Sequence, residues 1–308
     1  MVLAAKIEKK SRKFNTFESL TVTLNALFPL ITKMKRLFLV LSSVLLGVAS
    51  LSAQQTYEVG VFLGGSFYLG DLNPNGFFKF TQPAAGIIYR YNINNRFSAR
   101  GSVLVGTVTA YDNQSSSAFQ QQRNLNFKSP IDELSGQIEF NFFEYEIGNP
   151  KFNFSPYIFG GFGLFRMNPE GKIGTQWVDL QPLHTEGQGT QYNPVAPYHL
   201  IQPCIPFGIG IKTNFSATIC LSIEWGLRKT FTGYIDDVSG LYPNAAQLAK
   251  SEGPNASLAL TMSNRSNQSS AALTGIQRGN GKDDWYSFAG IILSFHPKHL
   301  VNECFSYF

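Results

Sequence analysis

The chain has 308 residues, a formal net charge of +5, 14% aromatic residues and only 15% charged residues, whereas a typical soluble domain carries about 25% charged residues. Its mean hydropathy is near zero, which excludes a helical membrane protein but suits a transmembrane β-barrel, because apolar and polar residues alternate along each barrel strand. The basic residues are scattered apart from a group at 6–13, so no nucleic-acid-binding surface is expected.

A signal peptide is predicted at residues 34–53. Two basic residues there precede an apolar run, and the small residue Ala53 follows it at the expected cleavage point. A single membrane anchor is the alternative, but the run of about 15 residues is shorter than the ~20 that cross a bilayer. No cysteine lies near the cleavage point, which argues against a lipoprotein. We expect Met34 to be the true start, residues 1–33 to be a mis-called extension, and the mature chain to begin near Gln54.

Period-two alternation of apolar and polar residues predicts an all-β chain with eight strands within residues 54–296. In the clearest strand, 217–229, Ile223 and Trp225 share one face while Glu224 lies on the other. The predicted strands are, in order, 57–67, 82–92, 97–110, 133–142, 152–166, 205–212, 217–229 and 285–295.

The connections between these strands alternate between short and long. Tight turns are expected near 93–95, 148–150 and 213–216, where turn-forming residues gather. Outer loops 1 to 4 are expected at about 71–81, 111–130, 167–203 and 233–283. Outer-membrane barrels have short periplasmic turns and long outer loops. A soluble β-sandwich or lipocalin-like barrel also alternates, but the signal peptide and the loop asymmetry favour an eight-stranded antiparallel barrel in the bacterial outer membrane, with 297–308 as a periplasmic tail.

Charged residues are predicted on the inward face of the barrel. An eight-stranded barrel is just wide enough to be filled by its side chains, and an unpaired charge there would cost several kcal/mol. We therefore expect these acidic and basic residues to pair across the lumen. They are Glu58, Arg90, Arg100, Glu133, Glu139, Lys212, Glu224 and Arg228.

No catalytic, cofactor or metal motif stands out. The glycine-rich stretches at 160–163 and 208–210 lie within predicted strands and open no helix, so they do not form a phosphate-binding loop. The tail residues His296, His299 and Cys304 match no familiar metal-ligand spacing. We therefore predict that the protein is not an enzyme and takes no cofactor and no small-molecule substrate.

Two outer loops carry a recurrent group of carboxylates, amides and tyrosines. Consecutive carboxylates among aromatic residues are suited to bind a cation or a protein partner, and a hydrated, ordered loop base is the alternative. The remainder of loop 4, about 250–283, is rich in Ser, Asn, Gly and Ala and is predicted to be mobile. The loop-motif residues are Asp71 and Asn73 in loop 1 and Tyr234, Asp236, Asp237 and Tyr242 in loop 4.

The Gly-Asp-Leu-Asn-Pro sequence at 70–74 and above all the segment 228–242, with its Tyr-Ile-Asp-Asp-Val-Ser core, resemble the PorG family. These proteins are outer-membrane barrels of the type IX secretion system of Bacteroidetes. The resemblance covers about 54–296, although Gly233 stands where an acidic residue is expected. It implies a structural or docking role, in which the barrel associates with a periplasmic ring of PorK-like lipoprotein and PorN-like partner.

If the ring lies in the periplasm, its contacts should come from the short turns and the tail. The expected partner-binding residues are Asn149, Asn214, His299 and Cys304. An unpaired cysteine in an oxidising periplasm can bridge to another chain, so a disulfide from Cys304 to a ring subunit is one hypothesis and a free thiol the other. An adhesin that acts through outer loops 3 and 4 is the alternative function.

Overall fold

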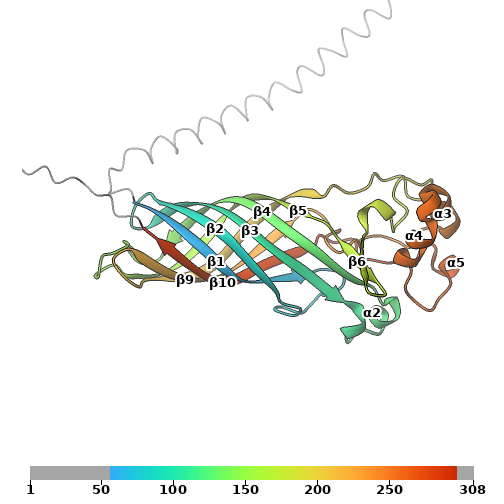
Figure 1. Cartoon of the computed structure of the whole chain (residues 1–308), viewed down its shortest axis with the longest axis horizontal. Coiled ribbons are helices and arrows are strands. Elements are labelled where there is room, and N and C mark those ends of the chain that lie inside the picture. Colours follow the sequence, from blue (N-terminus) through green and yellow to red (C-terminus); the bar gives the residue numbers. More distant parts are fainter. Residues whose placement is uncertain (1–55, 297–308) are drawn as a thin grey trace, which may run out of the picture. The chain divides into compact units, whose positions relative to one another are not determined.

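A closed, antiparallel β-barrel is seen in the computed structural model, which describes residues 56–296 (Figure 1). Each strand pairs with its neighbour in the chain, and the last strand pairs with the first from Val59↔Phe295 to Leu69↔Trp285. The barrel strands are β1 (Thr56–Leu69), β2 (Gln82–Asn92), β3 (Phe97–Tyr111), β4 (Asn126–Asn141), β5 (Phe154–Met167), β8 (Ile201–Asn214), β9 (Ile219–Thr230) and β10 (Trp285–Phe295). The predicted extension, signal peptide and tail, with His299 and Cys304, lie outside the described residues.

The barrel wall has the sidedness of a membrane protein. Large apolar side chains point outward, and Leu63, Ile87 and Leu134 each have more than 60% of their surface exposed. The intervening residues point inward and are mostly buried. Such a wall suits lipid rather than water, because its outward side chains are apolar. The closed barrel also pairs the backbone groups of each strand with those of its neighbours and leaves no open edge. The fold is therefore an eight-stranded transmembrane β-barrel of the outer-membrane type, as predicted.

The lumen is filled by the eight charged residues that alternation placed inside, and their predicted pairing is confirmed. Glu139 lies at the centre and accepts from Arg90, Arg100 and Lys212. The ion pairs are Arg90–Glu58 (2.8 Å), Arg90–Glu139 (2.9 Å), Arg100–Glu139 (3.1 Å), Arg100–Glu224 (2.6 Å), Lys212–Glu139 (3.1 Å) and Arg228–Glu133 (2.9 Å). Buried aromatic side chains, among them Tyr157 and Tyr286, pack between these pairs and bond to them.

Most strand ends lie within a few residues of the prediction, but the second periplasmic connection is longer than a tight turn. It runs through residues 142–153 and carries Tyr145 into the end of the barrel, where the ring packs under the ammonium group of Lys212, 4.9 Å from the ring centre. The Tyr145 hydroxyl donates to Asn214 Oδ1 at 2.5 Å. The turn residues at 148–150 were recognised correctly, whereas the buried tyrosine before them carries no turn signature.

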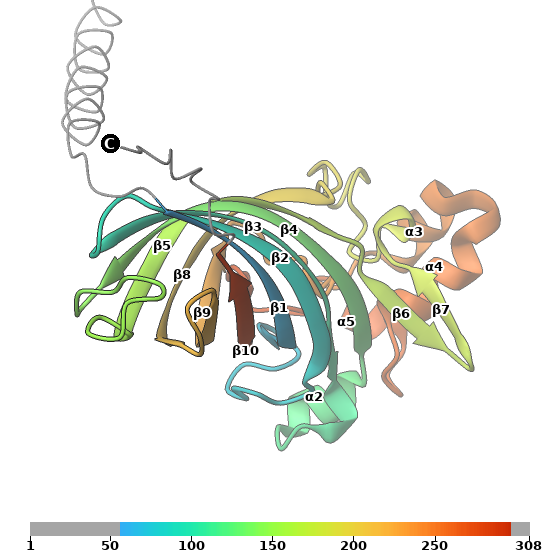
Figure 2. The same cartoon turned by 60° about the vertical axis from the view of Figure 1, so that its left-hand side comes forward.

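The long connections fold into additional elements at the outer end of the barrel (Figures 1 and 2). β6 pairs with β4 through Lys128↔Glu170 and with β7 as a hairpin that projects beyond the rim. These elements are η1 (Asp112–Gln114), α2 (Ala118–Arg123), β6 (Glu170–Ile173), β7 (Gln176–Asp179), η2 (Gln181–Leu183), α3 (Ala245–Glu252), η3 (Gly253–Asn255), α4 (Ala256–Ser263) and α5 (Ser270–Leu273). Among the described residues, no helix is long and apolar enough to cross a membrane.

Loop 4 contains helices α3, α4 and α5, whereas the sequence predicted a mobile segment over 250–283. Leu248 of α3 and Met262 of α4 bury their side chains against Leu180 and Leu183 of loop 3. The packing partners of these apolar residues are therefore distant in the sequence. A segment rich in small polar residues thus contributes to a small hydrophobic core. We call loops 3 and 4, residues 168–200 and 231–284, the outer cap.

Candidate functional site

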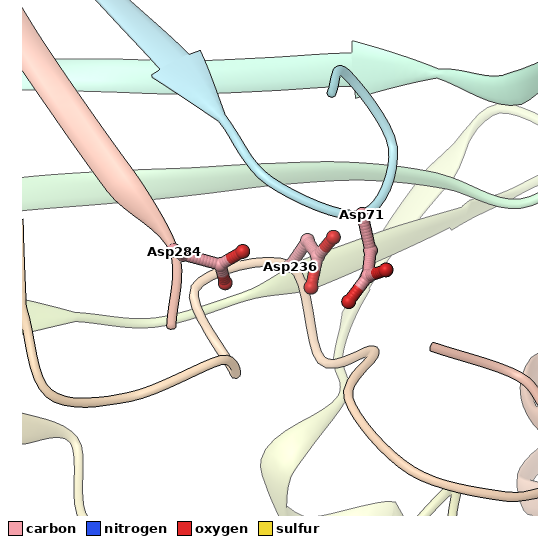
Figure 3. A group of neighbouring side chains, drawn as sticks. All are labelled: Asp71, Asp236 and Asp284. Carbon is pink, nitrogen blue, oxygen red and sulfur yellow. The ribbon is translucent and has the colours of Figure 1, made fainter. Parts of the chain in front are cut away.

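Three carboxylates meet where the outer cap joins the barrel wall (Figure 3). Asp71 follows β1, Asp284 precedes β10, and the pairing of β1 with β10 brings these two loop positions together. Asp236 comes from the turn after β9. One oxygen of each carboxylate lies within 4.8 Å of one oxygen of each other carboxylate, and all three side chains are buried. We call this group the carboxylate triad.

Each carboxylate of the triad is oriented by one backbone N–H group. Two of the donors lie in the turn after β9 and the third lies near the end of loop 4, so the geometry depends on the folded cap rather than on side-chain packing alone. They run from Asn280 N to Asp71 Oδ1 (2.8 Å), from Val238 N to Asp236 Oδ1 (2.9 Å) and from Ile235 N to Asp284 Oδ2 (3.0 Å).

The second oxygens of Asp236 and Asp284 share a single side-chain donor, the Tyr68 hydroxyl. The Tyr68 hydroxyl makes a short contact with Asp236 Oδ2 and lies 3.1 Å from Asp284 Oδ1. Asp71 Oδ2 is buried and has no hydrogen-bond partner. One proton donor therefore faces two acceptor oxygens, and the third oxygen faces no donor. Gly70 is required beside them, because a Cβ atom at this position would overlap Asp284 Oδ1 and the Tyr68 hydroxyl.

No basic side chain neutralises the triad. Within residues 56–296, none of its three carboxylates forms an ion pair. Burial raises the pKa of Asp71 to about 6, while its hydrogen bond from Asn280 and the charge of Arg123 act in the opposite direction. Burial, and then repulsion from the other carboxylates, raises the pKa of Asp236 and Asp284 well above the usual range.

Asp237 faces away from the triad although it follows Asp236 directly. Its backbone adopts a positive φ of 64°, which turns the side chain toward loop 3. There it accepts from Thr185 and, at 2.7 Å, from Tyr198, and it lies 3.8 Å from Arg278. Burial raises the pKa of Asp237 to about 6 as well, against the opposing charge of Arg278. The two consecutive carboxylates therefore serve separate parts of the cap.

The remaining loop-motif residues hold the scaffold around the triad. Asn73 Nδ2 donates to the carbonyls of Tyr68 (2.7 Å) and Gly76 (2.9 Å) and so fixes the turn of loop 1. Tyr234 stacks on Tyr198 with ring centres 4.7 Å apart. Tyr242 is buried within loop 4. The structure thus brings together Asp71 and Asp236 of the predicted motif.

Asp284 was missed by sequence reasoning. It is the second of the consecutive aspartates Asp283 and Asp284, directly before the last strand, a pair like Asp236 and Asp237 that was not singled out. A topological signal was also available, because a residue that immediately precedes the last strand must lie beside the residues that follow the first strand once the barrel closes.

The periplasmic candidates that can be described are engaged within the protein. Asn149 Nδ2 donates to the Glu146 carboxylate at 2.8 Å, and Asn214 Nδ2 donates to the Glu146 carbonyl at 2.8 Å. Both amides therefore hold the 142–153 connection in place. This leaves the turn as a defined surface at the end of the barrel opposite the triad.

The raised pKa of Asp71 should make the cap more stable at low pH than at neutral pH. The pKa of Asp71 is about 6 in the folded chain, against the ordinary value of 3.8. The stabilising contribution is therefore complete below the lower value and is lost as the pH rises through about 6. We expect the thermal midpoint, followed by near-UV circular dichroism, to be higher at about pH 5 than at about pH 7.5. Asp71→Asn should reduce this difference, and an equal difference in that variant would contradict the assignment.

Residues 35–257 match the family described as "Domain of unknown function (DUF6089)". No curated protein matches the chain. Among solved structures, the chain is similar to Neisserial surface protein A (8% identity, TM-score 0.38, 79% of this chain and 99% of that chain). It is also similar to Ail of Yersinia pestis in complex with sucrose octasulfate (9%, 0.36, 79% and 100%) and to OprG of Pseudomonas aeruginosa (8%, 0.32, 80% and 100%).

Proposed function

The chain belongs to the DUF6089 family, and we propose that it is a non-enzymatic outer-membrane barrel. In this proposal it serves as a docking component of a type IX protein secretion machine. Its partners would be a periplasmic ring of PorK-like lipoprotein and PorN-like protein, as the resemblance of the 70–74 and 228–242 segments to the PorG family implies. The substrates of the machine would not pass through this barrel.

The filled lumen is the observation that carries the proposal. Eight charged side chains pair with one another inside the barrel, and Tyr145 packs at its periplasmic end. Side chains of this size fill an eight-stranded barrel. A barrel with such an interior acts through the surfaces at its two ends rather than by conduction, which fits a structural component better than a pore.

The periplasmic end is where a ring would bind. We assign its contacts to the 142–153 connection with Asn149, to Asn214, and to His299 and Cys304 of the tail. Because Asn149 and Asn214 are bonded to Glu146 within the protein, the connection would be presented in one conformation. A preorganised surface loses less entropy on binding than a mobile loop.

Co-purification tests this proposal. The tagged barrel would be extracted from outer membranes in detergent, and the proteins that accompany it would be identified by mass spectrometry. Stoichiometric recovery of a ring lipoprotein and its partner is expected. Replacement of the exposed Lys151 and the half-buried Phe152 in the connection should reduce this recovery, while deletion of residues 270–276 in the outer cap should not. A barrel recovered alone would exclude the secretion role.

Cys304 offers a second test of ring association. An intermolecular disulfide from this residue would give a slower band on non-reducing gels, and the band should disappear in Cys304→Ser. Cys204 and Cys220 are both buried and free, so neither is expected to contribute such a band. An identical single monomer band in both forms would show that Cys304 does not bridge to a partner.

An adhesin remains the second candidate because the outer cap is a folded unit with exposed apolar side chains. Tyr192 and Val195 of loop 3 and Leu241 of loop 4 each expose more than half of their surface. Exposed apolar groups on an ordered surface can form the centre of a protein interface. Replacement of these three residues by serine should abolish surface binding if this is the function, and should leave ring association intact.

A further inference from the structure

We propose that the carboxylate triad of Asp71, Asp236 and Asp284 binds a divalent cation of the calcium class at the base of the outer cap. Figure 3 shows the three carboxylates in a row across loops 1 and 4. The site does not depend on the secretion role, because it would be equally present in a barrel that functions as an adhesin.

The arrangement of donors around the triad leaves oxygens free for a ligand. One oxygen of each carboxylate is held by a backbone N–H group. Of the second oxygens, those of Asp236 and Asp284 face the single hydroxyl proton of Tyr68, and Asp71 Oδ2 faces no donor. Asp71 exposes only 8% of its surface, so bulk water does not replace the missing hydrogen-bond partner. A buried carboxylate oxygen without a partner is costly, and a cation among the triad would satisfy it.

The charge of the triad also calls for a cation. The guanidinium of Arg123 lies near the triad, but its nitrogen atoms donate to other groups. Its Nε and Nη2 donate to both oxygens of Asp112 at 2.7 and 2.8 Å, and its Nη1 donates to the Arg278 carbonyl. Toward Asp71 it offers only a bond to the backbone carbonyl, at 3.1 Å. Buried charges in proteins are paired or coordinate a metal, and the triad carboxylates lack such a pair.

The donor atoms favour calcium. The triad consists of hard oxygen ligands and contains no histidine or cysteine, which disfavours zinc and copper. The ligands come from three separate segments, so the site can adjust to the irregular coordination of calcium more readily than to the strict octahedron of magnesium. Three carboxylates supply only part of the six to eight ligands of calcium, and water or loop carbonyls would supply the rest. Such open sites in extracellular modules bind with dissociation constants of about 10⁻⁴ to 10⁻³ M.

The test uses the full-length mature barrel, purified in detergent and freed of divalent ions. Calorimetric titration with CaCl₂ is expected to show one site. At ten times the dissociation constant, Ca²⁺ should slow proteinase K cleavage of the outer cap about tenfold, because ligand binding reduces the open population by that factor. Mg²⁺ at the same concentration should protect less.

Paired variants separate the site from general surface effects. Asp284→Asn and Asp71→Asn should lose Ca²⁺ binding and protection, while in the absence of calcium their caps should be at least as resistant as the wild type, since each removes one repelling charge. Asp283→Asn is the matched control, because Asp283 is adjacent in sequence but exposed and paired with Lys229 at the surface. It should keep full protection.

Several outcomes would overturn the proposal. One is the absence of binding and of protection up to about 10 mM Ca²⁺, ten times the weakest dissociation constant expected. Equal affinity for Mg²⁺ would remove the assignment to calcium. Equal loss of Ca²⁺ binding in Asp283→Asn and Asp284→Asn would show that the triad is not the site. A folded Asp284→Asn barrel, shown by its shifted mobility when unheated, ensures that lost binding is not lost folding.

Discussion

Glu139→Gln is expected to destabilise the barrel by about 3–5 kcal/mol, because it removes one partner from a buried charge network. Glu139 accepts from Arg90, Arg100 and Lys212 within 3.1 Å, and all of these side chains are inaccessible to solvent. Glutamine keeps the shape, but Arg90 then pairs with Glu58 and Arg100 with Glu224. Lys212 loses the carboxylate with which it forms its ion pair. The urea midpoint should fall, measured from the fraction of unheated protein that migrates as folded barrel on electrophoresis.

A second substitution inside the barrel and a control substitution on its outer face test whether the loss comes from the buried ion pairs. Adding Lys212→Met to Glu139→Gln should recover part of the loss, since it removes the cation that pairs with Glu139 alone. Asp132→Asn lies on the same strand, but Asp132 is half-exposed and 3.9 Å from Arg166, so its effect should be below about 1 kcal/mol. An unchanged urea midpoint in Glu139→Gln would show that the lumen pairs do not stabilise the fold.

Arg278→Met should loosen the outer cap without unfolding the barrel. Arg278 is fully buried and donates to Glu186 at 3.1 Å and to the Asp237 carbonyl at 2.6 Å. Its loss leaves two buried carboxylates without their cation, which costs about 3–5 kcal/mol. Proteinase K should then cleave within loops 3 and 4 at least a hundredfold faster, while the unheated protein still migrates as a folded barrel.

Lys282→Met serves as the control for this variant. Lys282 is exposed four residues further along loop 4 and contributes only a backbone hydrogen bond to Asn280. Its cleavage rate should match that of the wild type. If Arg278→Met instead caused the barrel to unfold together with the cap, so that the unheated protein no longer migrated as a folded barrel, the cap and the barrel would form one cooperative unit.

The barrel strands could be predicted because their signal is local. Alternation assigns a residue such as Trp225 or Glu224 to one face without knowledge of its neighbours, and the inward charges that it placed had no alternative but to pair. The positions of β6, β7 and the helices of loop 4 could not be predicted in this way. Leu248 and Met262 find their partners in Leu180 and Leu183 of another loop, and no periodicity in a short segment records such contacts.

The site was predicted only in part for the same reason. Asp71 and Asp236 belong to short acidic motifs, and the structure brings them together. Asp284 is one of the consecutive aspartates Asp283 and Asp284, but nothing in the local sequence marks it as the one that meets Asp71. The separation of Asp236 from Asp237 accompanies a positive φ at Asp237, a conformation that aspartate adopts more often than most residues but that the local sequence does not specify. Both features depend on contacts made in the folded barrel and cap.

The pairing of β1 with β10 also determines when the triad can exist. Asp71 follows the first barrel strand and Asp284 precedes the last, so the two meet only when these strands pair and the barrel is closed. An intermediate with open strand edges has the barrel wall but not the triad. Protection of the cap by a cation would then be confined to molecules whose barrel is closed.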